Sequence, residues 1–352
     1  TYSPFRSVLL REWRRMTSRR LYFGVCIVLP LFTLFFMATI FGNGQMENIP
    51  IGIIDQDNTA TSRAITRNIS AVPTFKVVKH YVNEAAAREA VQKKEIYGYL
   101  SIPPRFEQNA ITGKNATLSY YYHYALLSVG GELMAAFETS LAPVSLSPII
   151  MEAVSLGADQ QQITTFLLPV QANNHPIYNP NLDYSVYLSQ PFFFVLFQVL
   201  ILLTTVYTVG IEIKFRTATD WLATAKGNMI TAVLGKLLPY TFIYILIGWL
   251  GNYVMFGILH IPFQGSWWLI NMITVLFVIA TQALGLFIFS LFPAVSLVIS
   301  VVSMVGSLGA TLSGVTFPVS NMYPLVRDAS YLFPVRHFTE MIQTMLYGGG
   351  GF

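Results

Sequence analysis

Charge is scarce in this sequence. Its 352 residues contain 21 Lys or Arg and 17 Asp or Glu, together 11% of the chain, whereas soluble domains carry about 25% charged residues. The scarcity excludes a disordered chain and argues against an ordinary cytosolic enzyme, and a net charge of +4 is too small to indicate nucleic-acid binding. The single cysteine, Cys26, cannot form an intramolecular disulfide, so any exported domain must be stable through its own core. A chain that is 54% hydrophobic and poor in charge indicates a membrane protein.

The sequence also lacks the common catalytic and metal-binding motifs. It contains no P-loop, so it has no means of holding ATP phosphates in the P-loop manner, and no HExxH, CxxC or GxSxG motif. Its histidines show no ligand spacing. Asp55 and Asp57 could form a pair of carboxylates, but their position at a strand end favours a turn and a helix cap. We therefore predict no catalytic, cofactor-binding or metal-binding residues.

Charged residues are missing in blocks of membrane-spanning length. About 20 apolar residues cross a bilayer as a helix, and the uncharged blocks, divided at turn residues, predict five spans: 21–41, 187–211, 237–259, 268–291 and 294–312. We expect no Asp, Glu, Lys or Arg inside a span, which disfavours a proton- or sodium-coupled carrier.

The flanks of the spans predict the orientation. Residues 1–20 contain six Arg and residues 212–236 contain four Lys or Arg. The positive-inside rule places both segments on the cytoplasmic side and residues 43–185 outside. Five spans would leave the C-terminus outside, and the ending after Gly348–Gly351 suggests that a sixth helix is missing from this sequence.

Residues 43–185 alternate between strand and helix patterns. Strands are predicted at 49–55, 75–80, 96–102 and 117–122, with helical patterns between the first three. This order indicates βαβ units around a small, mostly parallel sheet, followed by a longer helix over 125–156 and a loop over 157–185. The predicted fold is a polytopic α-helical membrane protein with an inserted extracytoplasmic α/β domain. Its parts are 1–20 (interfacial helix), 21–42 (first span), 43–185 (inserted domain), 186–312 (spans two to five) and 313–352 (short outer helices that re-enter the interface).

Residues 4–20 form an amphipathic stretch. Trp13 lies on its apolar face, and Arg11 and Arg15 lie opposite, where we expect them near anionic headgroups. Glu12 falls on the apolar side and needs a partner. The stretch is either a membrane anchor or a functional joint, and the sequence leaves both interpretations open.

The segment 212–236 is too long and too patterned for a simple hairpin. Residues 218–225 can form a short helix whose Trp221 and Leu222 present an apolar face to the cytoplasm, where a protein partner could bind. Alternatively, Trp221 only anchors the loop at the interface.

Five sets of motifs, in order along the chain, resemble those of the type-2 permeases of ATP-binding-cassette (ABC) exporters, in the bacterial branch with a large domain after the first span. They are Leu10-Arg11-Glu12 with Arg19, Arg20 and Pro30; Ile51 to Asn58 with Ser62-Arg63; Gly98 to Phe106; Glu212, Thr217, Asp220-Trp221-Leu222 and Gly235 to Tyr240; and Leu312-Ser313-Gly314, Phe317-Pro318 and Pro334 to Phe338. Arg216 stands where the family usually has glycine, and Ala225 where it usually has proline.

The resemblance implies a permease subunit of the bacterial inner membrane that pairs with a second permease copy and docks on cytoplasmic ABC ATPase subunits, which bind ATP and Mg. It also implies export of an amphipathic or drug-like molecule, in some members with a periplasmic adaptor, along a path lined by spans two and five. The implied ATPase-coupling residues are Glu212, Arg216, Thr217, Asp220, Trp221, Leu222 and Lys226; those of the interfacial helix are Arg11, Glu12, Trp13 and Arg15; those of the outer region are Phe317, Pro318, Pro334 and His337.

Two other classes of function remain open. One is a membrane receptor or envelope-assembly protein whose outer domain binds a ligand or partner without transport. The other is a membrane-embedded enzyme, against which the lack of converging polar groups in the spans argues.

Overall fold

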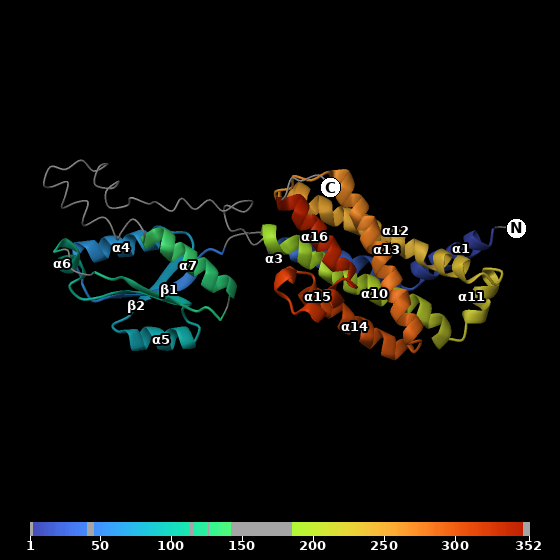
Figure 1. Ribbon diagram of the computed structural model, residues 1–352, viewed down its shortest axis with the longest axis horizontal. Coiled ribbons are helices and arrows are strands. Elements are labelled where there is room, and N and C mark those ends of the chain that lie inside the picture. The colour runs from blue at the N-terminus through green and yellow to red at the C-terminus, as the bar shows by residue number, and fades with distance from the viewer. Residues whose placement is uncertain (1–2, 41–45, 113–115, 126, 142–184, 348–352) are drawn as a thin grey trace. The chain divides into compact units, whose positions relative to one another are not determined.

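The computed structural model describes residues 3–40, 46–112, 116–125, 127–141 and 185–347. The chain forms two compact units, one made of residues 1–44 and 176–352 and the other of residues 45–175. Figure 1 shows them as a small α/β domain and a helical bundle.

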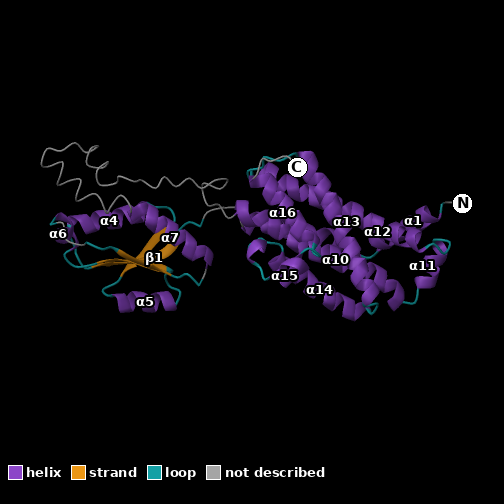
Figure 2. Ribbon diagram, viewed as in Figure 1, coloured by secondary structure: helices purple, strands orange, loops and turns teal. Residues whose placement is uncertain are grey.

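The α/β domain contains a four-stranded sheet. Its strands are β1 (Ile49–Asp55), β2 (Phe75–His80), β3 (Gly98–Ile102) and β4 (Ser119–Tyr122), in the spatial order β2-β1-β3-β4. Figure 2 shows the sheet between the helices of this domain. Strand β1 is parallel to β2 and β3, and β4 is antiparallel to β3. The predicted strands at 49–55 and 75–80 are confirmed, and the other two begin two residues later than predicted.

Both faces of the sheet are covered. Helices α4 (Ala60–Ala71) and α7 (Leu127–Leu141) pack on one face, where Ile53 and Leu100 are fully buried, and α5 (Glu84–Gln92) packs on the other, against Ile54 and Tyr99. This division follows from the alternation of side chains along each strand. Of the predicted helix over 125–156, the structure describes α7 to Leu141. Its remainder and residues 157–184 of the predicted loop over 157–185 lie outside the described residues.

The Asp55 and Asp57 carboxylates build a turn. Asp55 Oδ1 accepts the backbone N–H groups of Asp57 and Asn58, each at 3.0 Å. Asp57 accepts the N–H groups of Phe106 at 2.9 Å and Glu107 at 3.0 Å, which begin helix α6 (Phe106–Ile111). The interpretation as a turn and a helix cap is therefore confirmed.

The helical bundle contains, among the described residues, five helices long and apolar enough to cross a membrane, as the sequence predicts. They are Arg20–Ile40, which comprises α2 (Arg20–Phe23), a π-helical segment (Gly24–Val28) and α3 (Leu29–Ile40); α10 (Gln190–Lys214); α12 (Met229–Asn252) with its π-helical extension Tyr253–Ile258; α13 (Trp267–Leu291); and α14 (Val295–Leu312). Helix α10 is central, because it contacts α3, α12, α13 and α14 and is the most buried of the five.

Four charged residues lie within these helices but outside the predicted spans: Arg20, Glu212, Lys214 and Lys236. Helix α10 continues to Lys214 and α12 begins at Met229, so Glu212 belongs to the last turn of α10 and Lys236 to α12. The connecting segment is thus shorter than the predicted 212–236. Glu212 and Lys236 are tolerated there because they pair with each other near the end of the bundle.

The remaining helices are short. Helix α1 (Pro4–Ser18) precedes the first span and α11 (Ala218–Thr224) connects α10 to α12. After α14 follow a 3₁₀ turn (Val319–Asn321), α15 (Pro324–Ser330) and α16 (Pro334–Tyr347), of which α16 packs on α13 and α10. Short helices in this region were predicted; their entry into the membrane interface stays a prediction.

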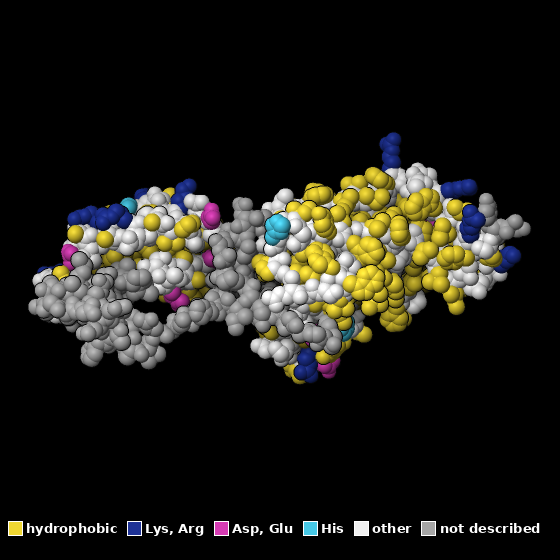
Figure 3. Space-filling model, turned by 90° about the horizontal axis from the view of Figure 1, so that it is seen from above, with side chains coloured by type: hydrophobic (Ala, Val, Ile, Leu, Met, Phe, Trp, Pro, Cys, Tyr) yellow, Lys and Arg dark blue, Asp and Glu magenta, His cyan; other side chains and the backbone are white. Residues whose placement is uncertain are grey.

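The surface of the bundle divides into an apolar middle and a charged end. Hydrophobic side chains cover the middle, while Lys and Arg stand out at the end that carries α1 and α11 (Figure 3). An apolar face of this kind is the surface that a membrane-spanning helical bundle presents to lipid.

Candidate functional site: a buried charge cluster beside helix α11

Helix α1 lies against α12 over a close contact. Val8 is fully buried there, and a Cβ placed on Gly235 would lie 3.0 Å from two atoms of Val8. Glycine at position 235 therefore permits the approach of the two helices. It brings the charged residues of α1 next to Lys236.

Five charged residues from three helices meet at this contact: Arg11, Glu12, Arg15, Glu212 and Lys236, here termed the charge cluster. The Lys236 ammonium Nζ lies 2.7 Å from Glu12 Oε1 and 2.8 Å from Glu212 Oε1. All three side chains are fully excluded from solvent. Glu12, which falls on the apolar side of α1 in the sequence pattern, thus has its partner.

The two arginines complete the cluster from the side of α1. Arg11 Nη2 lies 3.1 Å from Glu212 Oε2, and Arg15 Nη1 donates to Glu212 and lies 3.4 Å from Glu12 Oε1. Burial lowers the pKa of Arg15, but the carboxylates of Glu12 and Glu212 raise it more, so the shift is upward. Both guanidinium groups face these carboxylates, and the expected placement of Arg11 and Arg15 near lipid headgroups stays a prediction.

Helix α11 is attached to the same cluster. The Thr217 hydroxyl donates to Glu212, and the Trp221 indole N–H donates to the Ala232 carbonyl at 3.2 Å. The Lys236 ammonium lies 5.1 Å from the centre of the Trp221 ring, within the range of a cation–π contact. Trp221 is only 4% exposed, so the expected exposed aromatic face is wrong for this residue, which instead fixes α11 to α12.

The charge cluster holds α1, α10 and α12 together. Three cations and two carboxylates are held together where little solvent reaches them. Removing one partner of a buried ion pair leaves an uncompensated charge and costs about 3–5 kcal/mol.

The outer side of the connecting segment remains open. Arg216, Asp220 and Lys226 are exposed and Leu222 is half-buried. Arg216 has φ of 56°, a left-handed conformation that glycine adopts without strain. This geometry explains why a glycine suits the position, and why Arg216 departs from that pattern at some cost in stability.

The other predicted residues do not join the cluster. Trp13 is exposed on α1. Phe317 and Pro318 lie in the segment after α14, Pro334 begins α16, and the His337 ring Nε2 lies 2.9 Å from the Tyr331 carbonyl oxygen. No hydrogen bond or ion pair among the described residues joins Phe317, Pro318, Pro334 or His337 to the charge cluster.

Lys236 is the member of the cluster that the predicted site residues leave out. The signal was present in Glu12, because a carboxylate on an apolar face requires a cation. The spacing of residues in the sequence does not identify Lys236 as that cation. Among the described residues, no group of three or more His, Cys, Asp or Glu side chains could hold a metal ion.

Comparison with known proteins places the chain in a family. The family model described as "ABC-2 family transporter protein" matches residues 20–352. The chain is 29% identical over 121 residues to the "Probable multidrug ABC transporter permease YbhS" of Escherichia coli K12, and equally to the protein of that name from Escherichia coli O157:H7. Each match covers 33% of this chain and 31% of the relative, so the chain spans about a third of the length of these curated relatives.

No solved structure matches the chain. The family match, in contrast, covers most of the sequence and agrees with the five apolar helices and the inserted α/β domain. The chain belongs to the ABC-2 family of transporter proteins, as a permease.

Proposed function

We propose that this chain is the membrane-spanning subunit of an ATP-driven exporter, and that the charge cluster transmits motion from separate ATPase subunits to the spans. Permeases of the ABC-2 family lack nucleotide-binding domains, so ATP and Mg belong to the partner. The observation that carries the proposal is the Lys236 ammonium, which joins Glu12 of α1 to Glu212 of α10. The ATPase would dock on the exposed residues Arg216, Asp220 and Lys226 around α11.

The orientation is part of the proposal. The end that carries α1 and α11 is cytoplasmic and the inserted domain lies outside, in a bacterial inner membrane. The Lys and Arg side chains at that end support this orientation, since such residues favour the cytoplasmic side of membrane proteins.

Cargo would move along the first span, α10 and α14. These helices line an apolar pocket of about 250 Å³, which includes Tyr22, Cys26, Leu203, Tyr207 and Ile299. An apolar lining of this kind suits an amphipathic or drug-like molecule, as the printed name of the relative YbhS also suggests. The first span and α14 are the least buried of the five, which supports a second permease copy as their partner. A periplasmic adaptor would bind the inserted domain.

Asp220 offers the sharpest test, because it is exposed and its replacement should leave the fold intact. The chain is reconstituted in vesicles with its co-purified ATPase, and ATP hydrolysis and transport of a fluorescent amphipathic cation are measured together. Asp220→Lys should reduce transport and uncouple it from hydrolysis. The matched control is Asp328→Lys, which changes another exposed aspartate on a seven-residue helix, α15.

Transport unaltered in Asp220→Lys would refute the assignment of α11 as the docking site. Vesicles that contain this chain alone should not transport. Ligand binding by the inserted domain without any ATPase-dependent transport would support the receptor function instead.

A further inference from the structure

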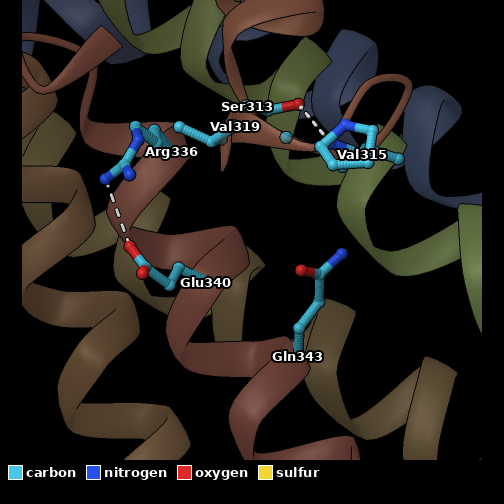
Figure 4. A pocket seen from close by; sticks show the side chains of 8 residues that line it. Ser313, Val315, Val319, Arg336, Glu340 and Gln343 are labelled. Carbon is cyan, nitrogen blue, oxygen red and sulfur yellow. Dashed lines mark hydrogen bonds and ion pairs between the residues drawn. The ribbon is translucent and has the colours of Figure 1, made fainter. Parts of the chain in front are cut away.

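A polar pocket lies at the opposite end of α14 from the charge cluster. It has a volume of about 380 Å³ and lies between the segment that follows α14 and helix α16 (Figure 4). Arg336, Glu340 and Gln343 line it from one face of α16, since they are spaced by four and three residues along the helix. Ser313 and Val319 line it from the other side.

Arg336 is a buried cation with an unmet donor. The residue is 5% exposed, its guanidinium carbon lies 4.1 Å from the centre of the Tyr331 ring, and Nη1 lies 3.1 Å from Glu340 Oε2. Its Nε is buried and has no hydrogen-bond partner among the described residues. A buried charged donor without an acceptor is costly, and the planar guanidinium fork matches the oxygens of a phosphate.

Glu340 gives the pocket a second charge of opposite sign. Its side chain is 64% exposed, whereas that of Arg336 is only 6% exposed, so the carboxylate is the accessible member of the pair. A purely anionic ligand would be repelled by Glu340, and a purely cationic ligand by Arg336. A ligand that carries both charges can instead exchange the internal ion pair for two ion pairs of its own, without leaving a charge unpaired.

We propose that this pocket binds a zwitterionic group that pairs a phosphate with a primary ammonium, as phosphoethanolamine does. The phosphate accepts hydrogen bonds from Arg336 and from the Gln343 amide, whose side chain extends toward the pocket, and the ammonium donates to Glu340. This inference concerns a region separate from the charge cluster and does not depend on the proposed coupling.

The place of the pocket in the bundle favours a lipid headgroup as the source. Ser313 and Gly314 directly follow Leu312, the last residue of a candidate membrane span, so the pocket lies at the depth where headgroups are found. Leu325 and Leu332 are each 73% exposed in the neighbouring segment and offer apolar surface to acyl chains.

The test measures lipid binding to the purified full chain by native mass spectrometry in detergent. Three phospholipids with the same acyl chains are added: phosphatidylethanolamine, the anionic phosphatidylglycerol, and phosphatidylcholine, whose quaternary ammonium has no N–H. Phosphatidylethanolamine should bind in preference to both. Glu340→Gln should reduce its preference over phosphatidylglycerol by about two- to fivefold, the size expected for one exposed ionic contact, and Gln343→Ala should weaken binding of both lipids.

The matched control is Glu89→Gln. Glu89 forms an exposed ion pair with Lys93, at the same four-residue spacing as Arg336 and Glu340, but lies in the inserted domain. It should change no lipid preference. Neither Glu340 nor Gln343 is buried, so these variants should fold even if Arg336 variants do not.

Free phosphoethanolamine is the second arm of the experiment. If free phosphoethanolamine displaces phosphatidylethanolamine, and does so less well in Glu340→Gln, the result supports both the site and the chemistry. Binding of free phosphoethanolamine without any preference among the lipids supports the same chemistry with a soluble source. Equal binding of the three lipids together with no effect of free phosphoethanolamine, or an unchanged preference in Glu340→Gln, overturns the proposal and leaves the exporter function untouched.

Discussion

Glu12 and Lys236 are 224 positions apart in the sequence and form an ion pair of 2.7 Å from which solvent is excluded. The pair fixes the amphipathic helix α1, which lies outside the spans, to the helix that follows α11. The buried pair favours a joint over a simple membrane anchor as the role of α1. A helix that only anchored the chain in the interface would have no need of a buried carboxylate, because burying a charge is costly.

Lys236→Met should loosen α1. The change leaves Glu12 and Glu212 buried without their shared cation, and we expect a loss of about 3–5 kcal/mol from the attachment of α1. Trypsin cleaves after arginine, so detachment should be seen as faster cleavage at Arg11, Arg14 and Arg15. Lys76→Met, which removes an exposed lysine of β2, is the control and should not change the rate.

Adding Glu12→Gln to Lys236→Met should recover part of the loss, since one of the stranded carboxylates is then neutral. The double variant could instead lose as much attachment free energy as the two single variants added together. In that case Glu12 and Lys236 do not act as a pair, and the joint has been assigned wrongly.

Gly235→Leu should separate α1 from α12 without touching a charge. The space at position 235 is already filled by Val8, so a larger side chain overpacks the contact, at a cost of about 1–3 kcal/mol. The same tryptic assay reports it. Val8→Ala in the Gly235→Leu background should restore part of the attachment, and Gly131→Ala, at an open position of α7, should be neutral. Tryptic rates that do not differ between Gly235→Leu and the parent chain would mean that the close contact is unimportant.

The fold was predictable where the signal is local. Strand β1 could be read from its apolar run and the turn at Asp55, and the spans from the absence of charge, because both depend on residues that are neighbours in sequence. The helix ends were less accurate, since Glu212 and Lys236 look like loop residues until their pairing is known.

The site could be predicted only in part. The position of Glu12 on an apolar face predicts that it pairs with a cation. Which lysine or arginine it pairs with depends on the packing of α1 on α12 at Gly235. For Trp221 the sequence does not predict which surface the side chain faces. An aromatic residue on a short helix gives the same sequence pattern whether it contacts a partner protein or its own chain. Burial decides between them, and burial is a property of the tertiary structure.

Arg216→Gly should stabilise the connecting segment. Arg216 has φ of 56°, where a side chain is strained and glycine is not. The strain removed from the folded state should outweigh the entropy that glycine adds to the unfolded chain. The free energy of unfolding should therefore rise by up to about 1 kcal/mol. Thermal unfolding of the purified protein in detergent measures the gain. A lower unfolding temperature for Arg216→Gly would show that the arginine side chain makes contacts that outweigh the strain.

Asp57→Ala should destabilise the inserted domain through two lost anchors. The Asp57 carboxylate accepts the first two N–H groups of α6 and the Thr59 hydroxyl at 2.7 Å, so its removal leaves a helix start uncapped and a turn unsupported. Loss of such a cap costs about 0.5–2 kcal/mol. Pulse proteolysis with a protease that cuts within residues 56–112 compares the parent chain with Asp57→Ala and Asp57→Asn. Because the asparagine keeps one acceptor oxygen, Asp57→Asn should lie between the other two. If instead Asp57→Ala leaves proteolysis unchanged while it abolishes a function of the domain, the carboxylate acts in chemistry or binding and not as a cap.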